Sequence, residues 1–215
     1  MPIENESFVI FEGGWTVRVQ PALSNPPTSV ITFLHGWTGN ENSMGIFSRG
    51  LESAWKFYPR GPIRLGNGFA WIDDQSVTSV RLSSFEPVSQ TLFDGITNWI
   101  DTHKLNGLPV YLVGFSQGAA MALSLTLRYP LFQRTAILSG FLPDGGESFL
   151  LGKSLSGKVF LIAHGRLDEL VPVDLARKTF QILENAGASV DYCEEDVGHK
   201  LSKSCFDRLK VFLSC

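Results

Sequence analysis

Cysteine is scarce in this sequence, with Cys193, Cys205 and Cys215 among 215 residues. An odd number of cysteines late in the chain makes neither a disulfide framework nor the paired spacing of a structural zinc site. We therefore expect free thiols in a reducing compartment. The first residues, MPIENESFVIFEGG, contain two early glutamates and only a short apolar run, unlike a secretory signal. These features predict a cytoplasmic protein.

An excess of either charge is also missing, because 18 Lys and Arg face 21 Asp and Glu, a formal net charge of -3. The basic residues form no stripe of the kind that a phosphate backbone requires, so nucleic acid is not an expected partner. One apolar stretch, residues 109–130, is long enough to raise the question of a membrane. Gly114, Gly118 and the Ser116–Gln117 pair divide it, and we expect no membrane span.

Internal repeats and low-complexity segments are absent as well. The chain is 44% hydrophobic and long enough for one sizeable core, but too short for two independent ones. We predict a single domain over residues 1–215.

Short β-rich runs alternate with segments of helical spacing. Strands are expected at 29–34, 55–59, 109–114, 135–140, 158–165 and 189–195. Helices are expected over 46–54, 88–103, 119–128, 173–187 and 201–212, with a loop rich in Gly, Ser and Pro before Val88. Strands that are apolar on both faces imply a mostly parallel sheet with helices on both sides. The runs SFVIFE and WTVRVQ, joined by Gly13 and Gly14, predict an antiparallel hairpin at the sheet edge.

The stretch VGFSQGAA contains the pattern G-x-S-x-G where a strand pattern changes to a helix pattern. Gly114 ends the β-rich run, Ser116 follows two residues later, and Gly118 two after that. A nucleophilic serine needs such a turn, because a strained backbone exposes its hydroxyl above the sheet and small neighbours let strand and helix approach closely. With this much Gly and Ser, roughly 0.2 copies of the pattern arise by chance. Its position between strand and helix therefore carries the prediction.

A nucleophilic serine also needs a base, and the base needs a carboxylate that orients it. Asp168 lies just beyond the strand KVFLIAHG, and His199 lies in the loop after the next strand. The chain order Ser116, Asp168, His199 is the order found in α/β-hydrolases. Because parallel strands end at one edge of an open sheet, the three side chains can converge there. We predict that they form a catalytic triad.

Other titratable residues also lie near predicted loops. His35 ends an early strand, His103 on a helix is expected to be structural, and His164 is expected to hold a loop through a ring-to-backbone hydrogen bond. Asp174 is expected to favour a helix N-terminus. The remaining carboxylates near loops are Asp144, Glu194, Glu195 and Asp196. The last three are interpreted as an acidic solvated loop, since no metal-ligand spacing accompanies them.

An acyl-transfer site also needs two N–H groups that hold the oxyanion. One is expected from Gln117, the residue after the nucleophile, and the other from Trp37 in the loop ITFLHGWTGNENS. An ordinary glycine-rich turn is the alternative interpretation of that loop. The sequence assigns no role to the Gln117 side chain.

Six segments together resemble the phospholipase/carboxylesterase family of α/β-hydrolases: LHGWTGNE, GNGFAWID, VGFSQGAAMAL, LSGFLP, HGRLDELVPVDLA and VGHKLS. The resemblance extends from about Val30 to His199. It implies an α/β-hydrolase fold without a large lid, and it implies the same triad and oxyanion residues. Two positions depart from the pattern: Thr38 stands where the family often has glycine, and Arg166 where acyl-protein thioesterases usually have an acidic residue.

These residues predict a serine carboxylesterase that hydrolyses small or medium apolar carboxylic esters through an acyl-enzyme, with no metal or other cofactor. Its expected partner is a small-molecule ester. Six apolar residues are expected to bind the substrate, with core packing as the alternative for about half of them: Phe69, Trp71, Phe141, Leu142, Leu170 and Val171. The alternative functions are a thioesterase or lysophospholipase for longer acyl chains, or a ligand receptor without turnover. A dienelactone-hydrolase-like enzyme is disfavoured because the turn carries serine rather than cysteine.

Overall fold

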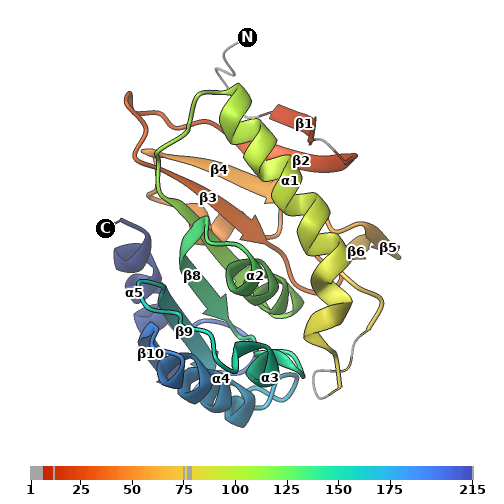
Figure 1. The fold of residues 1–215 in the computed structure, drawn as a ribbon, viewed down its shortest axis with the longest axis vertical. Helices are drawn as coiled ribbons and strands as arrows, with labels where there is room; N and C mark the ends of the chain where they lie inside the picture. Colours follow the sequence, from red (N-terminus) through yellow and green to blue (C-terminus); the bar gives the residue numbers. More distant parts are fainter. Residues whose placement is uncertain (1–6, 12, 75, 77–78, 215) are drawn as a thin grey trace.

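The centre of the fold is an eight-stranded sheet with the strand order β1-β2-β4-β3-β7-β8-β9-β10 (Figure 1). The computed structural model describes residues 7–11, 13–74, 76 and 79–214. The strands are β1 (Ser7–Phe11), β2 (Trp15–Gln20), β3 (Ser29–Leu34), β4 (Ala54–Pro59), β7 (Val110–Phe115), β8 (Phe132–Leu138), β9 (Val159–Gly165) and β10 (Ser189–Glu195). Within this sheet, as the structure describes it, only the pairs β1–β2 and β2–β4 are antiparallel. The mostly parallel sheet and its antiparallel N-terminal edge are confirmed.

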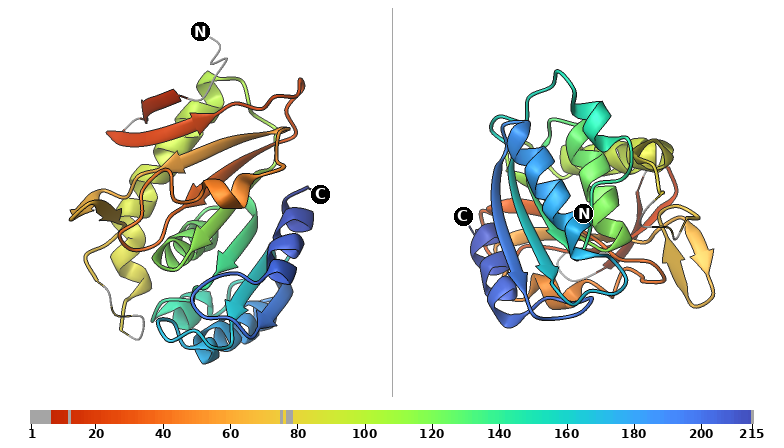
Figure 2. Two further views of the ribbon diagram at one scale, coloured as in Figure 1. Left: turned by 180° about the vertical axis from the view of Figure 1, so that it is seen from behind. Right: turned by 90° about the horizontal axis from the view of Figure 1, so that it is seen from below.

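Helices cover both faces of this sheet. They are α1 (Glu86–Thr102), α2 (Gln117–Arg128), the short α3 (Gly146–Leu150), α4 (Val173–Asn185) and α5 (Lys203–Ser214). Figure 2 shows α5 on the opposite side of the sheet from α2 and α4. Along β7, Val110 and Leu112 belong to the core under α1 and α2, whereas Tyr111 and Val113 belong to the core under α5. Both faces of the strand are buried, which explains its unbroken apolar sequence.

The predicted helix over 46–54 is wrong. Phe47, Leu51 and Ala54 are buried or packed on the core, but Ile46 is exposed. Only Gly45–Ser48 forms a single turn of 3-10 helix, η1, and Ala54 already belongs to β4. Gly50 interrupts the segment with φ +84, a left-handed conformation that an α-helix does not contain.

The loop predicted before Val88 contains more structure than its composition indicates. Two short strands, β5 (Ile63–Leu65) and β6 (Gly68–Ala70), form a separate antiparallel hairpin. A 3-10 turn, η2 (Leu82–Phe85), then leads directly into α1, which begins at Glu86. The strands are three residues long each, too short for a periodic pattern to be recognised in the sequence.

The prediction of free thiols is wrong for two of the three cysteines. Cys193 on β10 and Cys205 on α5 form a disulfide between residues 12 apart in the sequence. Both are buried in the core where α5 packs on the sheet, so the fold brings together two side chains whose spacing carried no signal. Cys215 lies outside the described residues. Among the described helices, none combines the length and the apolar character that crossing a bilayer requires.

Candidate active site

Ser116 lies on the turn between β7 and α2, with φ 54 and ψ -120. This region of backbone conformation is unfavourable for a residue with a side chain, so the surrounding structure must hold it. The Ser116 N–H donates to the Leu138 carbonyl at 2.9 Å. A β-carbon on Gly114 would meet the backbone of Gly118, and one on Gly118 would meet the carbonyls of Leu34 and His35. The strand–turn–helix geometry expected of G-x-S-x-G is therefore present, and both glycines are needed for the close approach.

Asp168 and His199 meet at the same edge of the sheet. The His199 Nδ1–H donates to Asp168 Oδ2 at 2.7 Å, while Asp168 Oδ1 accepts the backbone N–H groups of Leu170 and Val171 at 3.0 and 2.9 Å. The carboxylate is fully buried. Both of its oxygens are thus committed, and the contact fixes the imidazole in the tautomer whose Nε2 can accept a proton.

His199 lies beside the nucleophile turn, because its ring centroid is 4.9 Å from that of Phe115, the residue before Ser116. Ser116 Oγ makes no hydrogen bond to any residue that the structure describes, and the side chain is partly exposed. Hydrogen bonds between catalytic groups often form only with substrate present, and a serine hydroxyl can rotate. The arrangement therefore has the parts of a nucleophile, a base and an orienting acid.

Two backbone N–H groups are available beside Ser116. Within the described part of the chain, neither the Trp37 N–H nor the Gln117 N–H donates a hydrogen bond. Gln117 begins α2, where the first N–H groups of a helix have no partner in the helix itself. Gly36, next to Trp37, packs on Ser116: a β-carbon there would lie 3.2 Å from the Ser116 Cβ. Two unpaired N–H donors beside a serine hydroxyl are the arrangement that an oxyanion would require.

The other histidines are committed to backbone groups. His35 donates from Nδ1 to the Gly36 carbonyl at 2.8 Å and accepts the Gly61 N–H on Nε2 at 2.9 Å. His164 donates from Nε2 to the Val171 carbonyl at 2.9 Å, and His103 contacts the Trp99 carbonyl through Nδ1 at 3.0 Å. Burial lowers the pKa of His35 and of His164, so both rings are held neutral.

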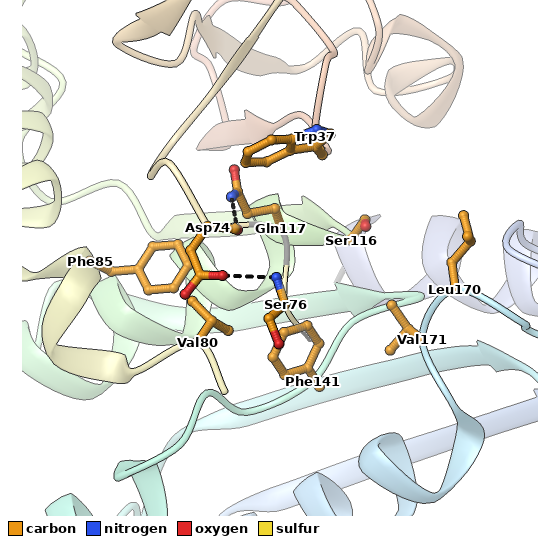
Figure 3. Close-up of a pocket in the computed structure, with 10 residues that line it drawn as sticks. All are labelled: Trp37, Asp74, Ser76, Val80, Phe85, Ser116, Gln117, Phe141, Leu170 and Val171. Atoms are coloured by element: carbon orange, nitrogen blue, oxygen red, sulfur yellow. Dashed lines mark hydrogen bonds between the residues drawn. The ribbon is translucent and has the colours of Figure 1, made fainter. Parts of the chain in front are cut away.

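A pocket of about 200 Å³ opens beside Ser116 (Figure 3). Its lining consists of Trp37, Asp74, Ser76, Val80, Phe85, Ser116, Gln117, Phe141, Leu170 and Val171. Three of the six residues expected to bind substrate are among these: Phe141, Leu170 and Val171. Six of the ten lining residues are apolar, and the polar part consists of Asp74, Ser76, Ser116 and Gln117.

The other three expected substrate residues lie outside this lining. Trp71 is buried, and its indole N–H donates to the His35 carbonyl at 2.7 Å. Phe69 lies under the Arg60 guanidinium, 4.8 Å from ring centroid to Cζ, and Leu142 packs against the core near α4. Core packing, the alternative given from the sequence, describes Trp71 best.

Four lining residues were not singled out from the sequence: Asp74, Ser76, Val80 and Phe85. Val80 and Phe85 lie in the segment before Val88 to which the sequence pattern gave no structure. Phe85 ends η2, and its ring lines one side of the pocket (Figure 3). Asp74 directly follows the GNGFAWID segment, and this position was the one signal in the sequence that could have drawn attention to it.

The acidic residues near His199 form an ion-pair network rather than a freely solvated loop. Glu194 accepts hydrogen bonds from Arg177, Arg166 and the Tyr192 hydroxyl. The Arg177 contact is the main reason why the pKa of Glu194 is lowered to about 2. Arg166 also pairs with Asp196. Among the described residues, no group of three His, Cys, Asp or Glu side chains could hold a metal ion.

Comparison with known proteins assigns the chain to a family. The model of the family described as Phospholipase/Carboxylesterase matches residues 18–215. The chain belongs to this family. The protein is therefore an ester-hydrolysing enzyme of the α/β-hydrolase fold, and the family predicted from the sequence is confirmed.

Individual relatives of this phospholipase/carboxylesterase family member are distant. The chain is 26% identical over 196 residues to "Probable carboxylesterase Os04g0669500" of Oryza sativa subsp. japonica, covering 81% of this chain and 73% of that protein. The carboxylesterase structure from Mesorhizobium loti has a TM-score of 0.83 and 22% identity, covering 98% and 99% of the two chains. The Bacillus cereus carboxylesterase has a TM-score of 0.82 and 20% identity, covering 93% of each. These two structures show that the fold is shared.

Thr38, which departs from the family pattern, lies in a backbone conformation that favours glycine. Thr38 has φ 59, a conformation that glycine adopts without cost. Its Oγ1 donates to the Trp37 carbonyl at 2.7 Å. Gly68 packs so closely on Thr38 that a β-carbon there would meet the Thr38 carbonyl. The loop thus keeps a left-handed residue next to Trp37 although the side chain is not glycine.

Proposed function

We propose that this enzyme is a serine carboxylesterase in which Ser116 is the nucleophile, His199 the general base and Asp168 the residue that orients it. The observation that carries the proposal is the 2.7 Å hydrogen bond from His199 to the buried Asp168 carboxylate, at the sheet edge where Ser116 occupies its strained turn. A base oriented by a carboxylate beside a serine on such a turn is suited to acyl transfer.

Attack on the ester begins when His199 Nε2 takes the Ser116 proton and Oγ adds to the ester carbonyl carbon. The tetrahedral oxyanion accepts hydrogen bonds from the Trp37 and Gln117 N–H groups, which have no competing partner among the described residues. The imidazolium that forms is stabilised by Asp168. His199 then gives its proton to the leaving alkoxide, which departs as the alcohol and leaves an acyl group on Ser116.

The second half of the reaction uses the same groups with water. His199 removes a proton from a water molecule, the hydroxide adds to the acyl carbon, and a second oxyanion is held by the same two amides. Collapse of this intermediate returns the proton to Ser116 Oγ and releases the carboxylic acid. No step requires a cofactor.

The pocket supports a small or medium apolar group as the substrate's acyl or alcohol part. It is only about 200 Å³ and is bounded by Val80, Phe85, Phe141 and Val171. Each methylene buried there contributes about 0.8 kcal/mol to binding. Esters larger than the pocket must leave part of the chain in solvent.

The direct test is hydrolysis of p-nitrophenyl esters by the purified protein and by Ser116→Ala. We expect hydrolysis by the wild type and a loss of at least about a thousand-fold in kcat for the variant, with the unfolding midpoint retained. Ser148→Ala, the same change at an exposed serine on α3, is the matched control and keeps full activity. Equal activity of Ser116→Ala and the wild type would remove Ser116 from the mechanism.

Chain-length profiles on oxygen esters and thioesters separate the alternatives. An optimum at short or medium oxygen esters supports the carboxylesterase, and an optimum at long acyl chains or thioesters supports the thioesterase or lysophospholipase. Absence of turnover together with ester binding supports the receptor.

We also propose the cytoplasmic location that the composition predicts. The Cys193–Cys205 disulfide is unusual for this location, because cytoplasmic thiols are kept reduced. Fractionation of the source cells tests the location directly: we expect the protein in the cytoplasmic fraction. Recovery of the protein from an exported fraction contradicts this location.

A further inference from the structure

The side chain of Gln117 is buried, yet the reaction uses only the backbone N–H of this residue. All of its polar atoms are engaged by one segment of backbone, residues Trp71–Asp74. Oε1 accepts the Trp71 N–H at 2.9 Å, and Nε2 donates to the Ile72 and Asp74 carbonyls at 3.1 and 3.2 Å. A primary amide offers two donors and one acceptor group, and each has a partner here.

The same segment is attached to the other half of the oxyanion hole. The Trp71 indole N–H donates to the His35 carbonyl at 2.7 Å. The centroids of the Trp71 and His35 rings are 4.9 Å apart. His35 precedes Gly36 and Trp37, whose N–H is the second oxyanion donor. Residues 71–74 are therefore connected to both sides of the position where the ester carbonyl must lie.

The segment also supplies the polar wall of the substrate pocket. Asp74 lines the pocket, and its Oδ1 accepts the N–H of Ser76, another lining residue, at 2.8 Å. Figure 3 shows the Gln117 amide group beside Asp74. Ser116, the residue before Gln117, lies on the other side of the Gln117 backbone from this amide group. Since Nε2 holds the Asp74 carbonyl, the location of this wall depends directly on Gln117.

We propose that the Gln117 side chain is a positioning residue that sets substrate selectivity, by fixing residues 71–74 as a pocket wall at a defined distance from the oxyanion hole. The inference rests on the proposed function. No other side chain makes the same contacts: asparagine is one methylene shorter, glutamate lacks both N–H donors when ionised, and the apolar methionine has the length without the hydrogen bonds. If residues 71–74 are displaced, the affinity for an ester that fills the pocket changes. The shortest esters do not reach these residues, so their affinity does not change.

The test compares Gln117→Met and Gln117→Glu with the wild type on two series of esters. One series varies the acyl chain of p-nitrophenyl esters, and the other varies the alcohol of acetate esters. The readout is the ratio of kcat/KM for the best pocket-filling ester to that for the shortest ester. We expect this ratio to fall about ten-fold in Gln117→Met, mainly through KM, because the wall binds ground state and transition state alike.

Gln117→Glu adds a signature that a purely structural role does not produce. Its ionised carboxylate would face the Ile72 and Asp74 carbonyl oxygens, which raises the pKa of the introduced group. On acidification it becomes protonated and can donate to one of these carbonyls, so the selectivity ratio recovers as the pH falls. Gln117→Met shows no such recovery. Gln181→Leu, at an exposed glutamine on α4, is the control and keeps the wild-type ratio.

Three results overturn the inference: no chain-length discrimination by the wild type in either series, an unchanged ratio in both Gln117 variants, or an equal loss for every ester. If Gln117→Met does not fold, the pH dependence of Gln117→Glu decides. Failure of the proposed function is recognised separately, because then the wild type hydrolyses no ester or Ser116→Ala retains its activity.

Discussion

Asp168 illustrates at the scale of one residue how the site depends on charge and geometry together. Its Oδ1 stays fixed by two backbone N–H groups, so an asparagine there would keep that contact and turn its N–H₂ group toward His199. Two donors would then face each other, and the imidazole would adopt the tautomer that cannot accept the Ser116 proton. We predict that Asp168→Asn lowers kcat by about ten thousand-fold without unfolding the protein.

Steady-state hydrolysis of p-nitrophenyl butyrate measures this loss, and circular dichroism reports the fold. His103→Gln is the control, because among the described residues this ring contacts the helix backbone and the neighbouring Trp55 and Trp99 rings. A loss below about ten-fold in Asp168→Asn would mean that His199 does not depend on this carboxylate.

Residues at strand ends could be placed from the sequence, whereas contacts between distant loops could not. Ser116, Asp168 and His199 each follow a strand that is recognisable from its β-rich sequence. The carboxyl ends of parallel strands lie at one edge of the sheet. The partners of the Gln117 side chain lie 43 to 46 residues away, in a segment without a pattern of its own. For the same reason Trp71 was expected at the substrate, although it holds the His35 carbonyl.

At the scale of elements, the loop that carries His199 is held at both ends. It connects β10 to α5, and the Cys193–Cys205 disulfide joins these two elements around it. Removing this disulfide increases the conformational entropy of the unfolded chain more than that of the folded protein. We predict that Cys193→Ser with Cys205→Ser lowers the free energy of unfolding by about 3 kcal/mol and the melting temperature by about 5 to 10 °C.

Differential scanning calorimetry with and without a reducing agent checks this prediction. Reducing agent lowers the melting temperature of the wild type to near that of the double variant and leaves the double variant unchanged. Identical melting temperatures of oxidised and reduced wild type would contradict it.

Elements with long apolar runs were predictable, and short ones bounded by glycine were not. The run around β7 is buried on both faces and reads as a strand without ambiguity. In contrast, the apolar spacing of Ile46, Phe47, Leu51 and Ala54 matches a helix, but Gly50 bends the chain and the four side chains are distributed over a turn, a loop and a strand. A periodic pattern indicates which side chains are buried; here Phe47, Leu51 and Ala54 pack on the core without a helix, and Ile46 is exposed.

For the whole molecule, two buried neutral histidines make stability depend on pH. Burial lowers the pKa of His35 and His164 below 6.5, while in the unfolded chain both return to that value. Below about pH 6.5 the unfolded chain therefore binds more protons, and stability falls as the pH falls. We predict a lower free energy of unfolding at pH 5.5 than at pH 7.5, by at most about 1.4 kcal/mol per pH unit for each histidine.

Urea denaturation at the two pH values measures this difference. The range from pH 5.5 to pH 7.5 avoids the titration of Glu194. The pKa of Glu194 is lowered from 4.5 to about 2, so its stabilising contribution is lost only below about pH 4.5. His164→Gln, which can still donate to the Val171 carbonyl, should reduce the pH dependence. A stability that stays constant or rises toward pH 5.5 would show that these rings are protonated in the folded protein.

The central claim is that Ser116 is the nucleophile, and covalent labelling tests it most directly. The folded protein is treated with a fluorophosphonate, digested, and the modified peptide is sequenced by mass spectrometry. We predict one phosphonate, on Ser116, and none after Ser116→Ala or in urea. A protein that hydrolyses esters but is labelled at another residue, or not at all, would contradict the account.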